Sequence, residues 1–405
     1  MTDAALKGVM VLDFTQFESG TTCTETLAWF GADVIKVERP GTGEQGRAGY
    51  GDTAEANSYD FILLNANKKS ITLDIKHPKG KELVLQLVKH ADVFVENFKP
   101  GAIEKLGFDY ETLRSINPRI IYAQIKGFGT DGPYADFPAF DPIGQAAGGC
   151  ASITGEANGP PMQAGPNLAD SGTGFHCAMG ILAALYQRTV TGLGQRIEVA
   201  MQDVVINFCR PSWGRYLKTG NPSGRVGNGM PLAPVAPCGV FPCSPGGPND
   251  YVYLYTSRWP GSRQWEKLLE VIGREDILDD PRFATPETRY KHNSEVDAII
   301  SAWTRKKTKY EAMEELGSAG VPAGAVLSNA DLSEDPYLRK RGMMVEVEHP
   351  QLGPVVMPGF PLKMSASLVP VQAAPLLGEH NQDVYAEILG ITAEELAKLK
   401  NDGVI

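Results

Sequence analysis

The sequence predicts an α/β fold with a mostly parallel sheet, and three observations support this. Short apolar runs of strand length alternate with helical segments through the first half of the 405-residue chain. The run at 9–14 is apolar at nearly every position, as expected for a parallel strand that is buried on both faces. Gly or Pro residues follow several of the runs. Strands separated by helices form βαβ units, which connect parallel neighbours through right-handed crossovers.

The first half of the chain contains five short apolar runs, and each is expected to form a strand. The expected strands are residues 9–14, 33–38, 70–74, 91–96 and 120–125, with helices expected at 21–30 and 80–90. Ligands of parallel sheets bind beyond the carboxyl ends of the strands. The segments most relevant to function are therefore 15–20, 39–46, 97–101 and 127–142. The spacing of Gly41, Gly43 and Gly46 matches a dinucleotide motif, but no helix pattern follows, so no nicotinamide or flavin cofactor is expected.

The second half of the chain mixes helices, strands and loops. Helices are expected at 171–188, 202–217, 265–271, 294–304, 310–319, 383–389 and 392–400, strands at 195–201 and 251–255, and a hairpin at 345–356. Residues 218–250 are expected to be a loop, because Pro and Gly recur every few positions there.

Composition argues against several partners. The net charge is −10, from 48 acidic and 38 basic residues, and no Lys/Arg block stands out, so no nucleic-acid partner is expected. No apolar run approaches bilayer length, so no membrane partner is expected either. Six scattered cysteines and the absence of a secretory signal pattern suggest a cytoplasmic protein. Cys238 and Cys243 lack further ligands nearby in the sequence, so no metal is expected.

Asp170 is the candidate catalytic residue. It stands between a Gly/Pro-rich loop and a helical stretch, at the predicted N-cap position. The positive end of the helix would favour its ionised form. Gly172 and Gly174 leave the first turn without side chains, which would let a ligand approach the carboxylate and free N–H groups. A purely structural N-cap is the alternative interpretation, and His176 is expected to be a core histidine.

Several blocks of the sequence resemble those of the family III CoA-transferases. They occur in the family's order almost end to end, at 6–13, 31–38, 67–71, 96–101, 168–172, 192–195 and 375–380. The resemblance implies a Rossmann-like large domain formed by 1–224 and rejoined by the C-terminal segment 326–405. It also implies a smaller α+β domain at 225–325. The family's dimers are interlocked, so a homodimer or a heteromer with a related subunit is expected.

The resemblance also implies a mechanism that suits Asp170. In this family an aspartate attacks an acyl-CoA thioester, and the reaction passes through a mixed anhydride and an aspartyl-CoA thioester. No prosthetic group is implied, because the coenzyme A thioester is the substrate. Gly246 and Gly247 resemble a shortened form of the mobile glycine loop that covers the site in the formyl-CoA transferase group. These two residues, Phe17 and Asp141 are the expected substrate pocket.

The CoA contacts carry over position by position. They are Glu18, Ser19, Arg39, Leu73, Asp74, Ile75, Lys76, Asn97, Phe98, Lys99, Lys105, Ala139 and Phe140. Arg39 matches a basic residue near the adenosine phosphates, and Lys105 stands where the family often has Arg. Pro138 replaces a Lys of the formyl-CoA transferase group. Glu18 replaces a Gln of that group next to the catalytic aspartate, so a different acyl group is expected.

Other activities of the same fold remain as alternatives. A racemase needs two acid/base groups, typically His and Asp, and Phe140 stands where the racemases have their His. A formyl-CoA:oxalate-type transferase and a non-catalytic partner subunit are further alternatives. Within the family, the chain looks closest to the benzylsuccinate CoA-transferase branch of anaerobic toluene degradation. That likeness implies succinyl-CoA as the donor, benzylsuccinate as the acceptor and a role as one subunit of the enzyme.

Overall fold

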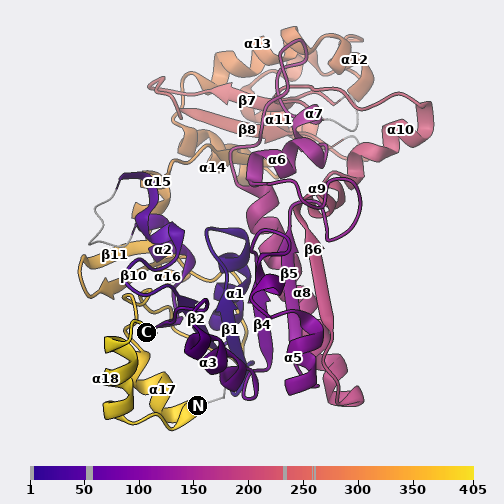
Figure 1. The fold of residues 1–405 in the computed structure, drawn as a ribbon. Helices are drawn as coiled ribbons and strands as arrows, with labels where there is room; N and C mark the ends of the chain where they lie inside the picture. The colour runs from indigo at the N-terminus through magenta and orange to yellow at the C-terminus, as the bar shows by residue number, and fades with distance from the viewer. Residues whose placement is uncertain (1–3, 52–57, 231–234, 258, 260) are drawn as a thin grey trace. The chain divides into compact units, whose positions relative to one another are not determined.

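The computed structural model describes residues 4–51, 58–230, 235–257, 259 and 261–405 (Figure 1). The chain forms two compact units. The first comprises Met1–Cys150, Ala164–Phe208 and Pro336–Ile405, and the second comprises Ala151–Gln163 and Cys209–Asp335. The expected small domain, 225–325, lies within the second of these sets of residues. The expected domain boundaries, after residue 224 and before residue 326, stay a prediction.

Within the described residues, the first unit contains a sheet of six parallel strands (Figure 1). The spatial order is β3 (Lys69–Thr72), β2 (Asp33–Glu38), β1 (Met10–Phe14), β4 (Val93–Glu96), β5 (Ile121–Lys126) and β6 (Arg196–Ala200). The register pairs Leu12 with Ile35 on one side and with Phe94 on the other. The predicted α/β class with a parallel sheet is confirmed. The strand order reverses between β1 and β4, where open sheets of this kind form a ligand-binding crevice.

Helices cover both faces of the sheet, because successive strand side chains alternate between them. Val11 packs on one side, with α1 (Ser19–Trp29) and α8 (Leu168–Thr191). Leu12 packs on the other side, where the helices are α3 (Pro78–Val88), α5 (Tyr110–Ile116), α17 (Asn381–Leu389) and α18 (Ala393–Asn401). On that side Phe94 stacks against Phe14 at 4.6 Å and against Tyr122 at 5.3 Å between ring centroids. The last two helices thus belong to the core of the N-terminal sheet.

Shorter elements complete the first unit. They are η1 (Gln45–Gly51), α2 (Tyr59–Leu64), α4 (Ala102–Lys105), α6 (Asp141–Ala147), α9 (Met201–Phe208), α16 (Pro336–Lys340) and the hairpin β10 (Met344–His349)–β11 (Gly353–Pro358). Helix α7 (Cys150–Ile153) crosses the boundary between the units. The hairpin was expected, whereas α6 was not, although Pro142 in its first turn is a recognisable start signal.

The second unit pairs a small antiparallel sheet with helices. Its strands are β7 (Cys238–Pro242), β8 (Tyr251–Tyr255) and β9 (Ala323–Ala325). Its helices are η2 (Arg210–Ser212), α10 (Trp213–Thr219), α11 (Gln264–Ile272), η3 (Glu275–Ile277), α12 (Pro286–Lys291), α13 (Asn293–Thr304), α14 (Lys309–Ser318) and α15 (Asn329–Glu334). Phe241, Leu254, Leu268 and Ile300 are fully or almost fully buried in its core.

Two predicted segments are wrong in this half of the chain. The single helix expected at 202–217 is interrupted, because Pro211 has no backbone N–H to continue the helical hydrogen bonds. The segment 218–250 was expected to be a loop, but it contains β7, which pairs with β8. Among the described residues, no helix is both long and apolar enough to cross a membrane.

Candidate active site

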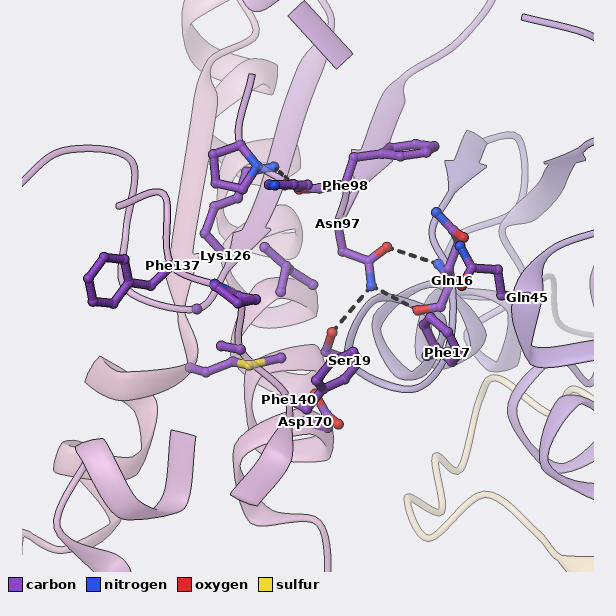
Figure 2. Close-up of a pocket in the computed structure, with 17 residues that line it drawn as sticks. Gln16, Phe17, Ser19, Gln45, Asn97, Phe98, Lys126, Phe137, Phe140 and Asp170 are labelled. Carbon is purple, nitrogen blue, oxygen red and sulfur yellow. Dashed lines mark hydrogen bonds between the residues drawn. The ribbon is translucent and has the colours of Figure 1, made fainter. Parts of the chain in front are cut away.

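Two neighbouring cavities open at the carboxyl ends of the sheet strands. The first has a volume of about 300 Å³ and is lined by segments around the ends of β1, β4 and β5 together with Asp170 of α8 (Figure 2). The second has a volume of about 620 Å³ and lies at the ends of β1, β2 and β3, beside Arg39. We call them the Asp170 pocket and the Arg39 pocket. They share Gln16, Gln45 and Phe98, so together they offer an elongated ligand a route to Asp170.

Many of the expected site residues line these cavities. The Asp170 pocket contains Phe17, Ser19, Asn97, Phe98, Lys99, Ala139, Phe140 and Asp170. The Arg39 pocket contains Arg39, Leu73, Asp74, Ile75 and Lys76. Glu18, Lys105 and Asp141 line neither cavity. Gly246 and Gly247 lie in the second unit, between β7 and β8, so their role at this site stays a prediction.

Some pocket residues were not singled out from the sequence. They include Gln16, Gln45, Lys126 and Met201. Gln16 and Gln45 lie in two of the segments that follow strands, so the position of those segments was the available signal. Which side chain of a loop faces the cavity depends on backbone turns that the sequence pattern does not specify.

Asp170 does not cap its helix. Helix α8 begins three residues earlier than expected, with Asn167 at the N-cap, so Asp170 is the third residue of the first turn and the predicted N-cap position is wrong. The carboxylate of Asp141, in α6, accepts hydrogen bonds from the backbone N–H groups of Ala169 (2.8 Å) and Asp170 (3.3 Å). These two amides already have a partner, so they are not the free donors that the sequence suggested.

The environment of Asp170 opposes ionisation. Burial raises its pKa to about 7, and the negative charges of Glu18 and Asp141 act in the same direction. The Glu18 carboxylate lies against the first turn of α8, where it accepts hydrogen bonds from Oγ of Ser171 (2.6 Å) and from Nδ2 of Asn167. The expected preference for the ionised form is therefore wrong. A carboxyl group with a strongly raised pKa in a cavity is typical of a functional site.

Gly172 and Gly174 allow helices to approach each other rather than giving a ligand access. A Cβ on Gly174 would lie 2.6 Å from the carbonyl oxygen of Ser19, and one on Gly172 would lie 2.4 Å from the ring of Phe208. Both glycines are buried. The interpretation of these residues as an open approach to Asp170 is wrong. Gly174 instead brings α8 against α1, which places Asp170 in the same pocket as Ser19, and Gly172 brings α8 against α9.

The loop after β1 is held in an unusual conformation. Phe17 has a φ of 57°, a left-handed value that costs energy for an aromatic residue and often marks functional sites. Its N–H donates to Oε2 of Glu44 at 2.9 Å. Its exposed ring meets that of Phe140 edge to face, with 6.2 Å between centroids. The structure therefore holds an aromatic pair beside Asp170 (Figure 2).

Asn97 fastens the segment after β4 to the same loop. Its side chain accepts a hydrogen bond from the N–H of Gln16 (2.9 Å) and donates to the carbonyl oxygen of Gln16 (2.8 Å) and to Oγ of Ser19 (3.3 Å) (Figure 2). The wall of the Asp170 pocket around Gln16 is therefore fixed by side-chain bonds as well as by the sheet.

A buried ion pair holds the backbone of Phe98, which follows Asn97. Lys126 and Glu96 are paired at 2.7 Å. The backbone of Phe98 donates to Glu96 and accepts from Lys126, each at 2.8 Å. Lys126 lines the pocket, but its charge is neutralised by Glu96.

The side chains around the site indicate which chemistry is available. Asp170 offers a partly buried carboxylate that can act as a nucleophile or a base. His176 does not line the pocket, and its ring nitrogens contact the carbonyl oxygen of Gly172 (2.7 Å) and Nδ2 of Asn207 (3.1 Å). The ring of His176 is hydrogen-bonded as expected, but the residue is only partly buried, so the expectation that it belongs to the core is wrong.

Residues 6–381 match the family described as CoA-transferase family III. A formyl-CoA:oxalate CoA-transferase of Streptomyces avermitilis is 45% identical over 412 residues, which cover 99% of both chains. An enzyme of the same name from Rhodopseudomonas palustris strain BisA53 is 44% identical and covers 99% of this chain and 97% of its own.

Solved structures show the same fold. A CAIB/BAIF family protein from Brucella suis has a TM-score of 0.85 and 33% identity, and covers 96% of this chain and all of its own. Rv3272 from Mycobacterium tuberculosis has a TM-score of 0.79 and 29% identity, and covers 95% of this chain and 99% of its own.

Proposed function

The chain belongs to CoA-transferase family III and is an enzyme of that class, and on this premise we propose that Asp170 is the nucleophile that carries CoA between two acids. The observation that carries this proposal is the position of Asp170. It is a carboxyl group with a raised pKa in a cavity that continues into a second, larger one. A thioester and its long nucleotide arm need such an extended site.

The Arg39 pocket suits the nucleotide end of CoA. Arg39 and Lys76 supply positive charge for phosphate groups, and the apolar side chains of Leu73 and Ile75 suit the adenine ring. The pantetheine arm would then pass the residues that the two pockets share. In this placement the thioester reaches Asp170, with Ser19 and the Phe17–Phe140 pair around it.

Each step of the proposed reaction exchanges one acyl bond for another. The Asp170 carboxylate attacks the thioester carbonyl, and the C–S bond breaks, which gives a mixed anhydride and CoA thiolate. The thiolate then attacks the aspartyl carbonyl and releases the donor acid as a carboxylate. The acceptor carboxylate next attacks this aspartyl thioester, which gives a second anhydride and thiolate. Attack of the thiolate on the acceptor's acyl carbon forms the new acyl-CoA and restores Asp170.

Two substrate pairs are candidates. The relatives are named for formyl-CoA and oxalate, which makes that pair one candidate. The likeness to the benzylsuccinate branch suggests succinyl-CoA and benzylsuccinate. The rings of Phe17, Phe137 and Phe140 around the Asp170 pocket favour the second pair, because an apolar acid body could pack against them.

The nucleophile can be tested by trapping. With a working substrate pair, hydroxylamine added during turnover should convert the aspartyl thioester into a hydroxamate, and mass spectrometry should find it on the peptide that contains Asp170. Asp170→Ala should lose transferase activity by at least about a thousandfold. The matched control is Glu111→Ala, which removes an exposed carboxylate in α5 and should keep full activity. Unchanged turnover by Asp170→Ala would rule out the nucleophile.

The substrate pair can be identified with a panel. Succinyl-CoA and formyl-CoA, each assayed with oxalate, carnitine and benzylsuccinate, separate the candidates by their kcat/KM values. The highest kcat/KM for succinyl-CoA with benzylsuccinate is the expected result. Oxalate or carnitine outperforming benzylsuccinate would remove the preferred acceptor.

A further inference from the structure

We propose that Glu18 sets the choice of acceptor: its charge beside Asp170 disfavours acids with two adjacent carboxylates, such as oxalate, and favours acids with one reacting carboxylate and an apolar body. This inference rests on the proposed function, because it assumes that the acceptor reacts at Asp170. Glu18 does not itself line the Asp170 pocket.

Two residues that flank Asp170 in the sequence, Asn167 before it and Ser171 after it, hold the Glu18 side chain in place. One carboxylate oxygen accepts a hydrogen bond from Oγ of Ser171 at 2.6 Å, and the other accepts from Nδ2 of Asn167. Ser171 follows Asp170 directly, and Asn167 caps the same helix. Two donors thus hold the Glu18 carboxylate on the first turn of α8.

Few positive charges offset this carboxylate in the described lining of the pocket. The cations there are Lys99 and Lys126. Lys126 is paired with Glu96 at 2.7 Å, so its charge is already balanced. Asp141 adds another carboxylate near Asp170. A second carboxylate bonded directly to the reacting one, as in oxalate, would therefore meet the negative field of Glu18 and Asp141 close to Asp170. In succinyl-CoA and benzylsuccinate, two further carbons separate the second carboxylate from the reacting carbon.

One part of the described lining suits an apolar body. Phe17, Phe137, Phe140 and Met201 line the pocket, and the three rings are each about half exposed. An apolar group that covers such rings removes their surface from water, which favours binding.

Oxalate has a second carboxylate next to the reacting one, and phenylacetate does not. Oxalate joins two carboxylates directly, so when one reacts at Asp170 the other lies within a few ångströms of the reacting carbon and meets the field of Glu18. Phenylacetate carries one carboxylate and an aromatic ring. At an effective dielectric constant typical of protein surfaces, one such repulsion changes a rate or affinity by about tenfold or more.

The test compares two acceptors in three proteins. The kcat/KM values for oxalate and phenylacetate are measured with whichever of succinyl-CoA and formyl-CoA the wild-type enzyme uses faster. The proteins are the wild type, Glu18→Gln and the control Glu111→Gln, an exposed carboxylate in α5. The wild type should favour phenylacetate by at least about tenfold, and Glu18→Gln should raise the oxalate-to-phenylacetate ratio by about tenfold. Glu111→Gln should leave the ratio unchanged.

Three results would overturn the role of Glu18. They are a wild-type preference for oxalate, failure of the wild type to use phenylacetate, and an unchanged ratio in Glu18→Gln. A purely structural role of Glu18 would lower both values together and leave the ratio constant. If Glu18→Gln does not fold, the wild-type preference decides. Failure of the proposed function is seen separately, as turnover that survives in Asp170→Ala.

Discussion

At the scale of single residues, the ionisation of Asp170 should control the rate. Only the carboxylate form can attack a thioester, and burial with Glu18 and Asp141 raises its pKa to about 7. The kcat/KM of the wild type should therefore rise with pH through about 7 and level off above it. Glu18→Gln removes one negative neighbour, so its profile should rise at a lower pH. A wild-type profile that stays flat between about pH 5.5 and 8.5 would contradict this assignment.

The same carboxyl group should make the folded state less stable at high pH. Its pKa is raised from the usual value of 3.8 to about 7, so the folded protein holds a proton that the unfolded chain has lost between these pH values. Stability therefore falls as pH rises through this window, and the whole cost is present above pH 7. Asp170→Asn should unfold at a higher temperature than the wild type at pH 8, with a smaller difference at pH 5. Calorimetry at both pH values measures this, and a pH-independent difference would contradict it.

At the scale of elements, the close approach of α8 to α1 can be tested at Gly174. Because a Cβ there would lie within 2.7 Å of Ser19 and Thr22 atoms, Gly174→Ala should destabilise the protein by about 1–3 kcal/mol. The shift should also displace Asp170 and lower activity. Gly165→Ala is the control, since a Cβ at Gly165 contacts nothing within 4 Å. Guanidinium unfolding gives both values, and equal effects of the two substitutions would exclude the packing role.

The elements were predictable where the signal is local. Residues 33–38 and 251–255 form the strands β2 and β8 as expected. The first run combines Val34, Ile35 and Val37 and ends at Pro40-Gly41, and the second alternates aromatic and aliphatic residues. Strand β7 was missed, because Pro and Gly surround it and its partner β8 provides the pairing. Pro211 ended a predicted helix early, and that signal was present in the sequence.

The location of the site was predictable from the sequence, but the protonation state of Asp170 was not. The reversal of strand order between β1 and β4 puts the loops with Ser19 and Asn97 at one crevice, as the βαβ pattern indicates. The charge state of Asp170 was not predictable in this way. The pKa of Asp170 is raised first by burial and then by the charges of Glu18, 152 residues away, and Asp141, 29 residues away, and all three effects arise only from tertiary packing.

At the scale of the whole molecule, the outer face of α8 remains uncovered in the single chain. Phe175, Met179, Tyr186 and Val190 are spaced so that they form one stripe along the 24-residue helix, with exposed fractions of 47%, 55%, 77% and 80%. Monomeric proteins rarely leave a continuous apolar stripe in water. We propose that a second subunit covers it, in line with the dimer that the family resemblance implied.

This assembly can be tested in solution. The wild type should sediment as a dimer, because covering the stripe removes apolar surface from water. The double substitution Tyr186→Glu with Val190→Glu should shift the protein towards monomer at micromolar concentration, because two carboxylates would be buried without partners. Leu368→Glu is the control, since this side chain is 79% exposed and lies outside α8. A monomeric wild type, or a double variant that sediments like the wild type, would show that the stripe is not the interface.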